Sequence, residues 1–107
     1  MAREKFQTLT EPMFYILLCL RRECCGEDIK AQVTELTHDR VSVGPGTLYN
    51  LLDSVLQAGM IRETGVSGRK RSYLITPKGQ ETLDAEYRRL LTLTKDYQFC
   101  TGKEDPS

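Results

Sequence analysis

Three consecutive basic residues, Arg69, Lys70 and Arg71, are the side chains with the clearest capacity for chemistry. They follow Gly68, and residues 60–80 as a whole hold five Lys and Arg against a single Glu. The complete chain, by contrast, carries 15 basic and 15 acidic residues and has a net charge of zero. Because clustered cations neutralise phosphates and local potential governs such contacts, this segment predicts phosphate binding. A solvated run of charges is the alternative interpretation.

A second group of polar side chains lies on a predicted helix between Pro45 and Gly59. Proline favours the first turn of a helix, and glycine favours the position just beyond its end. Apolar residues recur along one face of this segment, which leaves the other face for polar contacts. A helix of this length fits the major groove of B-DNA. Cap support by Thr47 and packing of Tyr49 against the following hairpin are the structural alternatives. The predicted contact residues are Gly46, Thr47, Tyr49, Asn50 and Ser54.

Cys24 and Cys25 are the candidates for redox or metal chemistry. The chain has four cysteines but one histidine, His38, and no C-x-x-C spacing, so no metal site is predicted. Partly buried structural thiols are the favoured interpretation, and a cysteine-based redox or metal sensor is kept as an alternative. Because no signal-like segment precedes the cysteines, we expect reduced thiols in a cytoplasmic protein.

Enzyme chemistry finds no support in the residue pattern. His38 adjoins Asp39 without a nucleophile nearby, and the glycines beside Pro45 are explained by a helix start. With 107 residues, 39% of them hydrophobic, the chain has material for one folded domain, which excludes a multidomain enzyme. The apolar run at residues 13–20 is too short to span a membrane. We therefore predict a non-enzymatic protein with no cofactor and no membrane contact.

The elements that carry these residues predict a mainly α (α+β) fold. Thr10 and Thr76 are expected helix N-caps, and two glycines interrupt a pair of short strand-like segments. Three helices followed by a two-stranded hairpin form the layout of a winged helix-turn-helix, with the basic cluster in the wing. The predicted elements are helices over residues 11–23, 27–37 and 45–58, strands over 60–64 and 71–75, and a long helix over 77–99.

The last helix carries a stripe of mostly apolar and aromatic residues, and a winged helix-turn-helix does not need such a helix. Its residues recur at alternating spacings of four and three, as in a coiled coil. We expect this stripe to pack against the first helix of a second copy, which would place two recognition helices about one DNA turn apart on a near-palindromic site. Packing within one subunit is the alternative interpretation. Residues 8–75 would then bind DNA, 76–100 dimerise, and 101–107 form a disordered tail. The predicted dimer interface comprises Phe14, Leu17, Leu18, Leu83, Tyr87, Leu90, Leu91, Thr94 and Tyr97.

Two motifs resemble the PadR-like family of transcriptional regulators. Residues 43–61 contain VGPGTLYNLL and LQAGMI, which are similar to that family's recognition helix and the turn after it. Residues 68–79, GRKRSYLITPKG, resemble its second wing strand and the start of its last helix. The resemblance covers residues 8–97. The chain departs from the family where Glu27 follows Gly26 in place of an aromatic residue, and where Asn50 occupies an often basic position. Asparagine can pair bidentately with adenine.

The resemblance implies a homodimeric repressor that binds double-stranded DNA and responds, in some members, to a small molecule. Flat aromatic effectors would bind between the first and last helices of the two copies, where Phe14, Tyr15 and Tyr87 are the candidate contacts. We therefore predict a sequence-specific DNA-binding transcriptional regulator. A winged-helix protein-interaction module without DNA binding is the alternative, and the acidic segment at residues 26–59 favours it.

Overall fold

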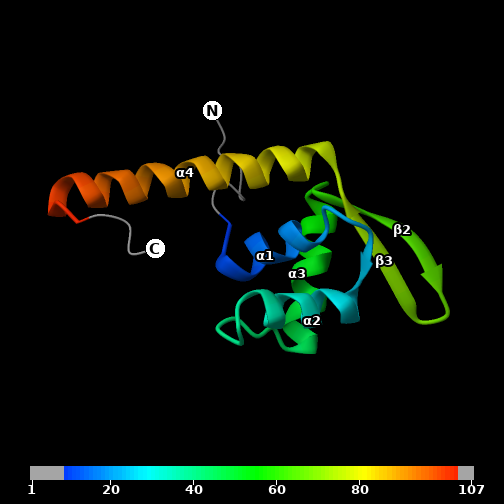
Figure 1. The fold of residues 1–107 in the computed structure, drawn as a ribbon. Helices are drawn as coiled ribbons and strands as arrows, with labels where there is room; N and C mark the ends of the chain where they lie inside the picture. Colours follow the sequence, from blue (N-terminus) through cyan, green and yellow to red (C-terminus); the bar gives the residue numbers. More distant parts are fainter. Residues whose placement is uncertain (1–8, 104–107) are drawn as a thin grey trace.

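The part of the chain that the structure describes, residues 9–103, forms four helices packed around a small antiparallel sheet (Figure 1). The structure is a computed structural model. The long helix α4 (Pro77–Thr101) runs along one side of the body, and the hairpin of β2 (Ile61–Ser67) and β3 (Lys70–Ile75) projects from the body as a wing. The predicted mainly helical architecture is confirmed. In chain order the elements are α1 (Glu11–Cys19), β1 (Cys24–Cys25), α2 (Gly26–Leu36), α3 (Pro45–Gln57), β2 (Ile61–Ser67), β3 (Lys70–Ile75) and α4 (Pro77–Thr101).

The sheet has three strands where the sequence predicted two. Strand β1 pairs with β3, so that Cys24 lies opposite Tyr73 and Cys25 opposite Ser72. The strand order is β1-β3-β2, with β3 in the centre. A two-residue strand carries no periodicity, and its pairing comes from tertiary contact alone. The prediction that helix 1 extends to residue 23 was wrong, because the chain leaves α1 after Cys19 and turns into this strand.

The wing is also longer than predicted. Strands β2 and β3 pair antiparallel out to Ser67 and Lys70, with a bulge between Glu63 and Gly65. The predicted six-residue loop is therefore a tight turn, in which Gly68 adopts the left-handed conformation at φ +62°. Glycine tolerates this conformation because it lacks a Cβ. The three basic residues consequently lie at the tip of an ordered hairpin.

The predicted helix caps are confirmed. The Thr10 hydroxyl accepts a hydrogen bond from the Met13 N–H at 3.3 Å, and the Thr76 hydroxyl accepts one from the Gly79 N–H at 3.1 Å. Each cap satisfies a backbone donor that the helix itself leaves without a partner. Gly59 follows α3 with φ +78°, as a C-terminal glycine should. These local signals therefore fix where α1, α3 and α4 begin or end.

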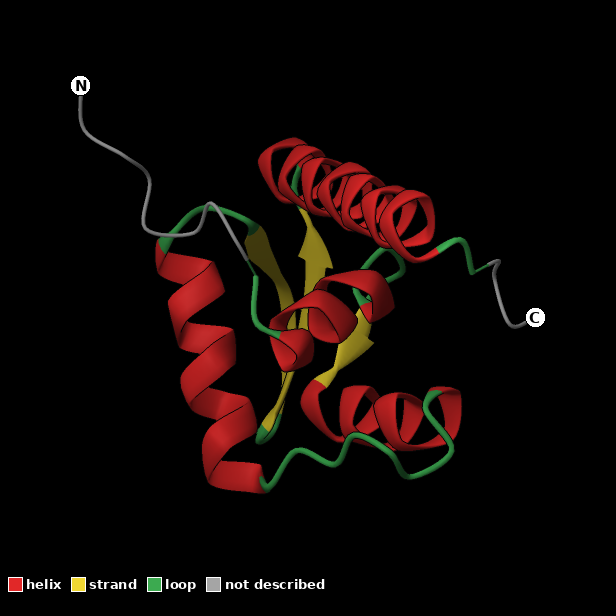
Figure 2. Cartoon of the chain, turned by 90° about the vertical axis from the view of Figure 1, so that its left-hand side faces the viewer, coloured by secondary structure: helices red, strands yellow, loops and turns green. Residues whose placement is uncertain are grey.

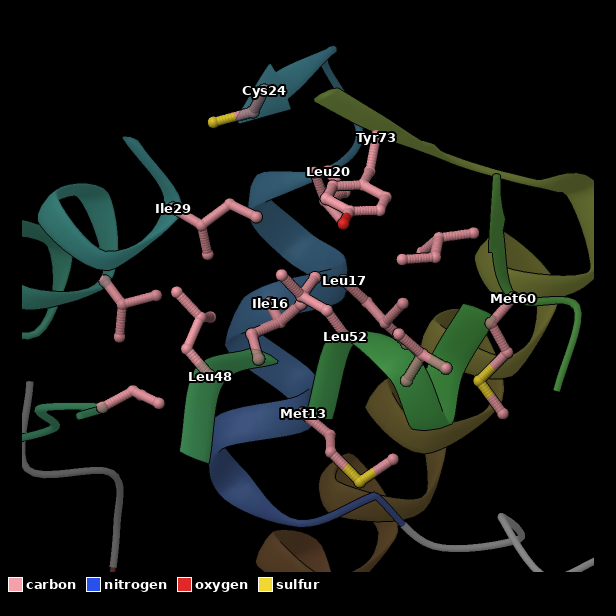
Figure 3. Packing of buried hydrophobic residues seen from close by; sticks show 14 of the residues in the cluster. Met13, Ile16, Leu17, Leu20, Cys24, Ile29, Leu48, Leu52, Met60 and Tyr73 are labelled. Atoms are coloured by element: carbon pink, nitrogen blue, oxygen red, sulfur yellow. The ribbon is translucent and has the colours of Figure 1, made fainter. Parts of the chain in front are cut away.

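Helix α1 lies at the centre of the hydrophobic core, as Figure 3 shows. Ile16, Leu17 and Leu20 are completely buried among side chains of α2, α3 and the sheet. Leu83 of α4 belongs to the same core and is 4% exposed. The predicted roles of Leu17 and Leu83 in a dimer interface are therefore revised, since both side chains are already covered within one subunit. Their apolar spacing reflects the core of the subunit itself.

The two halves of α4 have different surroundings. Its N-terminal half packs on α1, whereas its C-terminal half extends past the body (Figure 1). The extended half includes Thr101, which the sequence assigned to a disordered tail; residues 104–107 of that tail lie outside the described residues. Among residues 9–103, no helix is both long and apolar enough to cross a membrane. Exposed apolar side chains follow one another along α4: Tyr87, Leu90, Leu91, Leu93 and Tyr97.

The start of α4 fits tightly against the end of α3. The Thr76 N–H donates to the Met60 carbonyl at 2.9 Å, and the Thr76 hydroxyl donates to the Gly59 carbonyl at 2.6 Å. A Cβ at Gly79 would lie only 2.0 Å from the Met60 carbonyl oxygen. This close backbone approach requires glycine at position 79 and fixes the position of the long helix on the body.

We expect Gly79→Ala to destabilise the protein, because its methyl group meets backbone that cannot move aside. Overpacking of this kind costs about 1–3 kcal/mol. Thermal unfolding followed by circular dichroism should show Tm falling by roughly 4–8 °C for each kcal/mol of destabilisation. Gly46→Ala is the matched control, since Gly46 also lies in the first turn of a helix that begins with proline but has open space around it. A Gly79→Ala variant as stable as Gly46→Ala would contradict the tight fit.

Candidate nucleic-acid interface

The polar side chains predicted on the third helix share an exposed face of α3. Gly46, Thr47, Tyr49 and Asn50 are exposed, and Ser54 is half-buried. The opposite face holds the helix on the core through Leu48, Leu52 and Val55, all of them buried. Gly44 supplies no side-chain cap, so the first N–H groups of α3 are open to an anion. This face can therefore offer hydroxyl, amide and backbone donors to a polyanion.

Tyr49 has a second contact that the sequence did not indicate. Its ring lies against the first residue of α2, where a Cβ at Gly26 would come within 2.8 Å of the Tyr49 hydroxyl oxygen. The alternative of packing against the following hairpin did not include this neighbour at the start of α2. Tyr49 nevertheless stays 47% exposed. The contact explains why position 26 is glycine, and it orients the Tyr49 phenol from α3 toward the start of α2.

The basic residues of the wing are all exposed. Arg69, Lys70 and Arg71 lie at the turn between β2 and β3. The Arg71 Nε lies 3.5 Å from the Glu63 Oε2 on the neighbouring strand. Within the described residues, no ion pair involves Arg69 or Lys70. The wing therefore offers two free cations at its turn and a third that is shared with a carboxylate.

The wing is attached to the segment that follows α1, between Leu20 and β1. The Ile75 N–H donates to the Leu20 carbonyl at 2.8 Å, and the Thr64 hydroxyl donates to the Glu23 carboxylate. In Figures 1 and 2, the wing turn and the start of α3 both lie on the side of the molecule away from α4. The basic turn and the polar helix face are therefore held on one core, remote from the long helix.

The candidate effector residues are divided between two places. Phe14 of α1 and Tyr87 of α4 line a surface groove between the two helices, together with Leu18, Arg21, Gln80, Leu83 and Asp84. Tyr15 does not line this groove. Its ring packs edge-on against Phe14 at 5.9 Å, and its hydroxyl accepts a hydrogen bond from Arg40 at 2.7 Å. Tyr15 thus has a structural contact that sequence reasoning missed.

The adjacent cysteines are part of the sheet. Cys24 is buried, and the Gln32 side-chain amide lies 3.3 Å from its sulfur. Burial raises the pKa of the Cys24 thiol to about 11, which disfavours the thiolate that metal binding or oxidation requires. Among residues 9–103, no cluster of three or more His, Cys, Asp and Glu side chains could hold a metal ion. Their position favours the structural interpretation of this pair.

Known proteins with the same architecture include transcriptional regulators. A structure of RosR from H. salinarum has 25% sequence identity, covers 78% of this chain and 76% of that protein, and gives a TM-score of 0.68. Bacillus subtilis PadR in complex with operator DNA has 26% identity, covers 72% of this chain and 46% of that protein, and gives a TM-score of 0.60. A transcriptional regulator from Clostridium thermocellum, at 21% identity and a TM-score of 0.71, covers 90% of this chain and 100% of that protein and shares the fold.

The family assignment rests on the chain's own sequence as well as on these structures. No curated protein matches the chain. The model of the transcriptional regulator PadR-like family, however, matches residues 16–85, from the middle of α1 into the first half of α4. The matched region includes α3, the complete wing and the tight junction at Gly79. The chain therefore belongs to the PadR-like family of transcriptional regulators.

Proposed function

We propose that this chain is a sequence-specific DNA-binding regulator that acts as a homodimer and represses transcription. The observation that carries the proposal is the pairing of an exposed polar face on α3 with free cations at the wing turn, on one side of one core. The complex of Bacillus subtilis PadR with operator DNA supports it, because that protein shares the fold at 26% identity. A helix and a wing of this kind can contact adjacent grooves of a duplex.

In this proposal α3 enters the major groove. Asn50 reads a base edge, and Thr47 and Tyr49 donate hydroxyl hydrogen bonds to phosphates. Gly46 lets the backbone approach the DNA, and Ser54 lies further along the same face. Arg69 and Lys70 neutralise phosphates beside the helix, while Arg71 is shared with Glu63. Specificity comes from the helix, and much of the affinity comes from phosphate contacts.

The proposed dimer uses the exposed half of α4. Apolar side chains spread along a helix that extends past its own body leave a surface that a second copy can cover. Phe14 and Leu18 of α1 line the groove beside the N-terminal half of α4, which meets this surface at Tyr87, and Thr94 and Tyr97 continue the stripe beyond it. Residues 8–75 then form the DNA-binding domain and 76–100 the dimerisation helix. A two-fold axis would present two copies of α3 to a near-palindromic operator.

We further propose that a small aromatic effector binds in the α1–α4 groove lined by Phe14 and Tyr87. This groove borders the proposed dimer face, so a bound molecule can favour one subunit arrangement over another. Such a molecule would alter DNA affinity only if it binds the two arrangements with different affinity. Tyr15 would support the ring of Phe14 and would not contact the effector itself.

Fluorescence anisotropy tests the DNA-binding proposal. Labelled duplex taken from immediately upstream of the protein's own gene is compared with a scrambled duplex of equal composition, over a series of salt concentrations. We expect tighter binding to the upstream duplex and a salt slope that corresponds to several phosphate contacts. Equal, weak binding to both duplexes would instead favour the protein-interaction alternative.

The wing should supply a measurable part of the electrostatic affinity. Arg69→Ala combined with Lys70→Ala removes two free cations per subunit, so the slope of log K against log salt should become shallower by about 0.9 for each phosphate that is no longer neutralised. Both duplexes should bind more weakly, since phosphates carry no sequence information. Lys30→Ala combined with Lys95→Ala removes the same charge from α2 and α4 and should leave the slope unchanged. An unchanged slope in the wing variant would remove the wing from the interface.

Asn50 should control discrimination rather than general affinity. Asn50→Ala removes a side chain that can pair with a base edge, and such a contact contributes about 1–3 kcal/mol of discrimination. Anisotropy titrations should show reduced preference for the upstream duplex and little change with the scrambled duplex. Gln57→Ala, at the exposed end of the same helix, is the control. Equal weakening on both duplexes would assign Asn50 to phosphate contact.

The exposed face of α4 should hold the dimer together. Leu90→Glu places a charge in the apolar stripe, and sedimentation equilibrium should then show the 12.2 kDa single chain in place of a species of twice that mass. Thr92→Glu adds the same charge to the opposite face of α4 and should leave the dimer intact. A dimer that survives Leu90→Glu would place the interface elsewhere.

A further inference from the structure

The connection between α2 and α3 has a conformation that needs support. His38 and Asp39 both adopt the left-handed region, at φ +53° and +64°. Such conformations are uncommon for residues other than glycine and cost free energy. The Asp39 N–H donates to the Thr34 carbonyl at 2.9 Å, which reverses the chain at the end of α2. The path from there to the start of α3 depends on contacts made by the next few residues.

The inner side of this connection is held by Thr37 and two valines. The buried Thr37 hydroxyl lies 2.8 Å from the Val33 carbonyl and accepts a hydrogen bond from the Val41 N–H at 3.1 Å. Val41 and Val43 are buried in the core. These contacts hold the connection from within, close to α2, but none of them ties its outer side to another helix.

Arg40 supplies the contact on the outer side. One guanidinium nitrogen donates to the Glu11 carboxylate, and Nη2 donates to the Tyr15 hydroxyl at 2.7 Å. The guanidinium carbon also lies 5.9 Å from the centre of the Tyr15 ring. Glu11 and Tyr15 are one turn apart on α1, so the two partners lie on the same helical face. Arginine suits this site because its planar group presents directed N–H donors to two partners at once.

This contact links the connection before α3, the helix that faces DNA in the proposed function, to α1 and through α1 to the α1–α4 groove. Gly44, four residues after Arg40, is the N-cap of α3 and makes no side-chain hydrogen bond of its own. The position of the helix start therefore depends on the connection before it. On the other side, Tyr15 packs against Phe14, which lines the α1–α4 groove with Tyr87. Both Arg40 and Glu11 are more than half exposed, so their ion pair contributes little to global stability.

We infer that Arg40 is a positioning residue for DNA recognition, which tethers the α2–α3 connection to α1 and thereby sets where the reading end of α3 lies. The inference rests on the proposed function. Arg40 acts through the helix start and touches no base or phosphate itself. Its removal loosens residues 37–44 without unfolding the protein.

Arg40→Ala tests the inference through measurements with and without DNA. Affinity for the upstream duplex should fall by about fivefold per subunit, which is the upper range for an exposed ion pair. Affinity for the scrambled duplex, the salt slope and Tm should stay at wild-type values. Without DNA, hydrogen exchange should become faster at the backbone amides of residues 37–44 only. Arg88→Ala, an exposed arginine on α4, is the control and should change none of these quantities.

Tyr15→Phe tests the same contact by changing the partner of Arg40 on α1. It removes the hydroxyl that accepts the Arg40 hydrogen bond, so it should reproduce part of the weakening on the upstream duplex. The double variant should bind no more weakly than Arg40→Ala alone, because both changes break the same interaction. Additive effects in the double variant would overturn the tether.

The remaining outcomes separate the inference from the proposed function. A shallower salt slope with weaker binding to both duplexes would make Arg40 a phosphate contact, and a lower Tm with equal weakening would make it an ordinary structural residue. Either result overturns the positioning role. If the wild type does not distinguish the duplexes, the proposed function fails and the role in recognition fails with it. If hydrogen exchange at residues 37–44 is unchanged in Arg40→Ala, Arg40 does not hold the α2–α3 connection in place, and the inference fails even when the wild type binds DNA.

Discussion

The burial of α1 is the constraint on which the rest of the structure depends. Ile16, Leu17 and Leu20 have no exposed surface, and every other helix and the sheet lie around them. A nine-residue helix is marginal on its own, so its stability comes from this packing. The segment that follows α1 holds the wing, one face of α1 contacts α4, and its start holds the connection to α3. Moving α1 would therefore move each surface that the proposed function uses.

The fold was largely predictable because its signals are local. Threonine caps, helix-starting prolines and the glycine after α3 each act within a few residues, and all of them lie where expected. Strand β1 was not predictable, since two residues show no pattern and pair only because α1 delivers them beside β3. The longer wing strands were missed for a related reason: Gly65 suggested a loop, yet it lies in a bulged strand.

The candidate site was predicted in part. The polar face of α3 and the basic wing turn follow from residue type and spacing, and most of these side chains are exposed. Apolar spacing alone could not distinguish a subunit core from a subunit interface, which is why Leu17 and Leu83 were assigned to the wrong surface. The contacts of Tyr49 with Gly26 and of Arg40 with Tyr15 join residues far apart in the chain. No local pattern could have identified either of them.

Because α4 is held at Gly79 and extends past the body, a small tilt of the helix moves its free end by a much larger distance than its held end. Its 25 residues correspond to a rod about 37 Å long. One end is held where glycine meets the Met60 carbonyl, and the other end extends past the body. Because the N-terminal half also packs on α1, only about 15 residues, roughly 22 Å, extend freely, and by simple geometry a tilt of about 5° displaces their end by roughly 2 Å. A rotation too small to disturb the core thus moves the far end of α4 by about the H···O length of a hydrogen bond. The close fit at Gly79 determines how rigidly the helix follows the body in such a rotation.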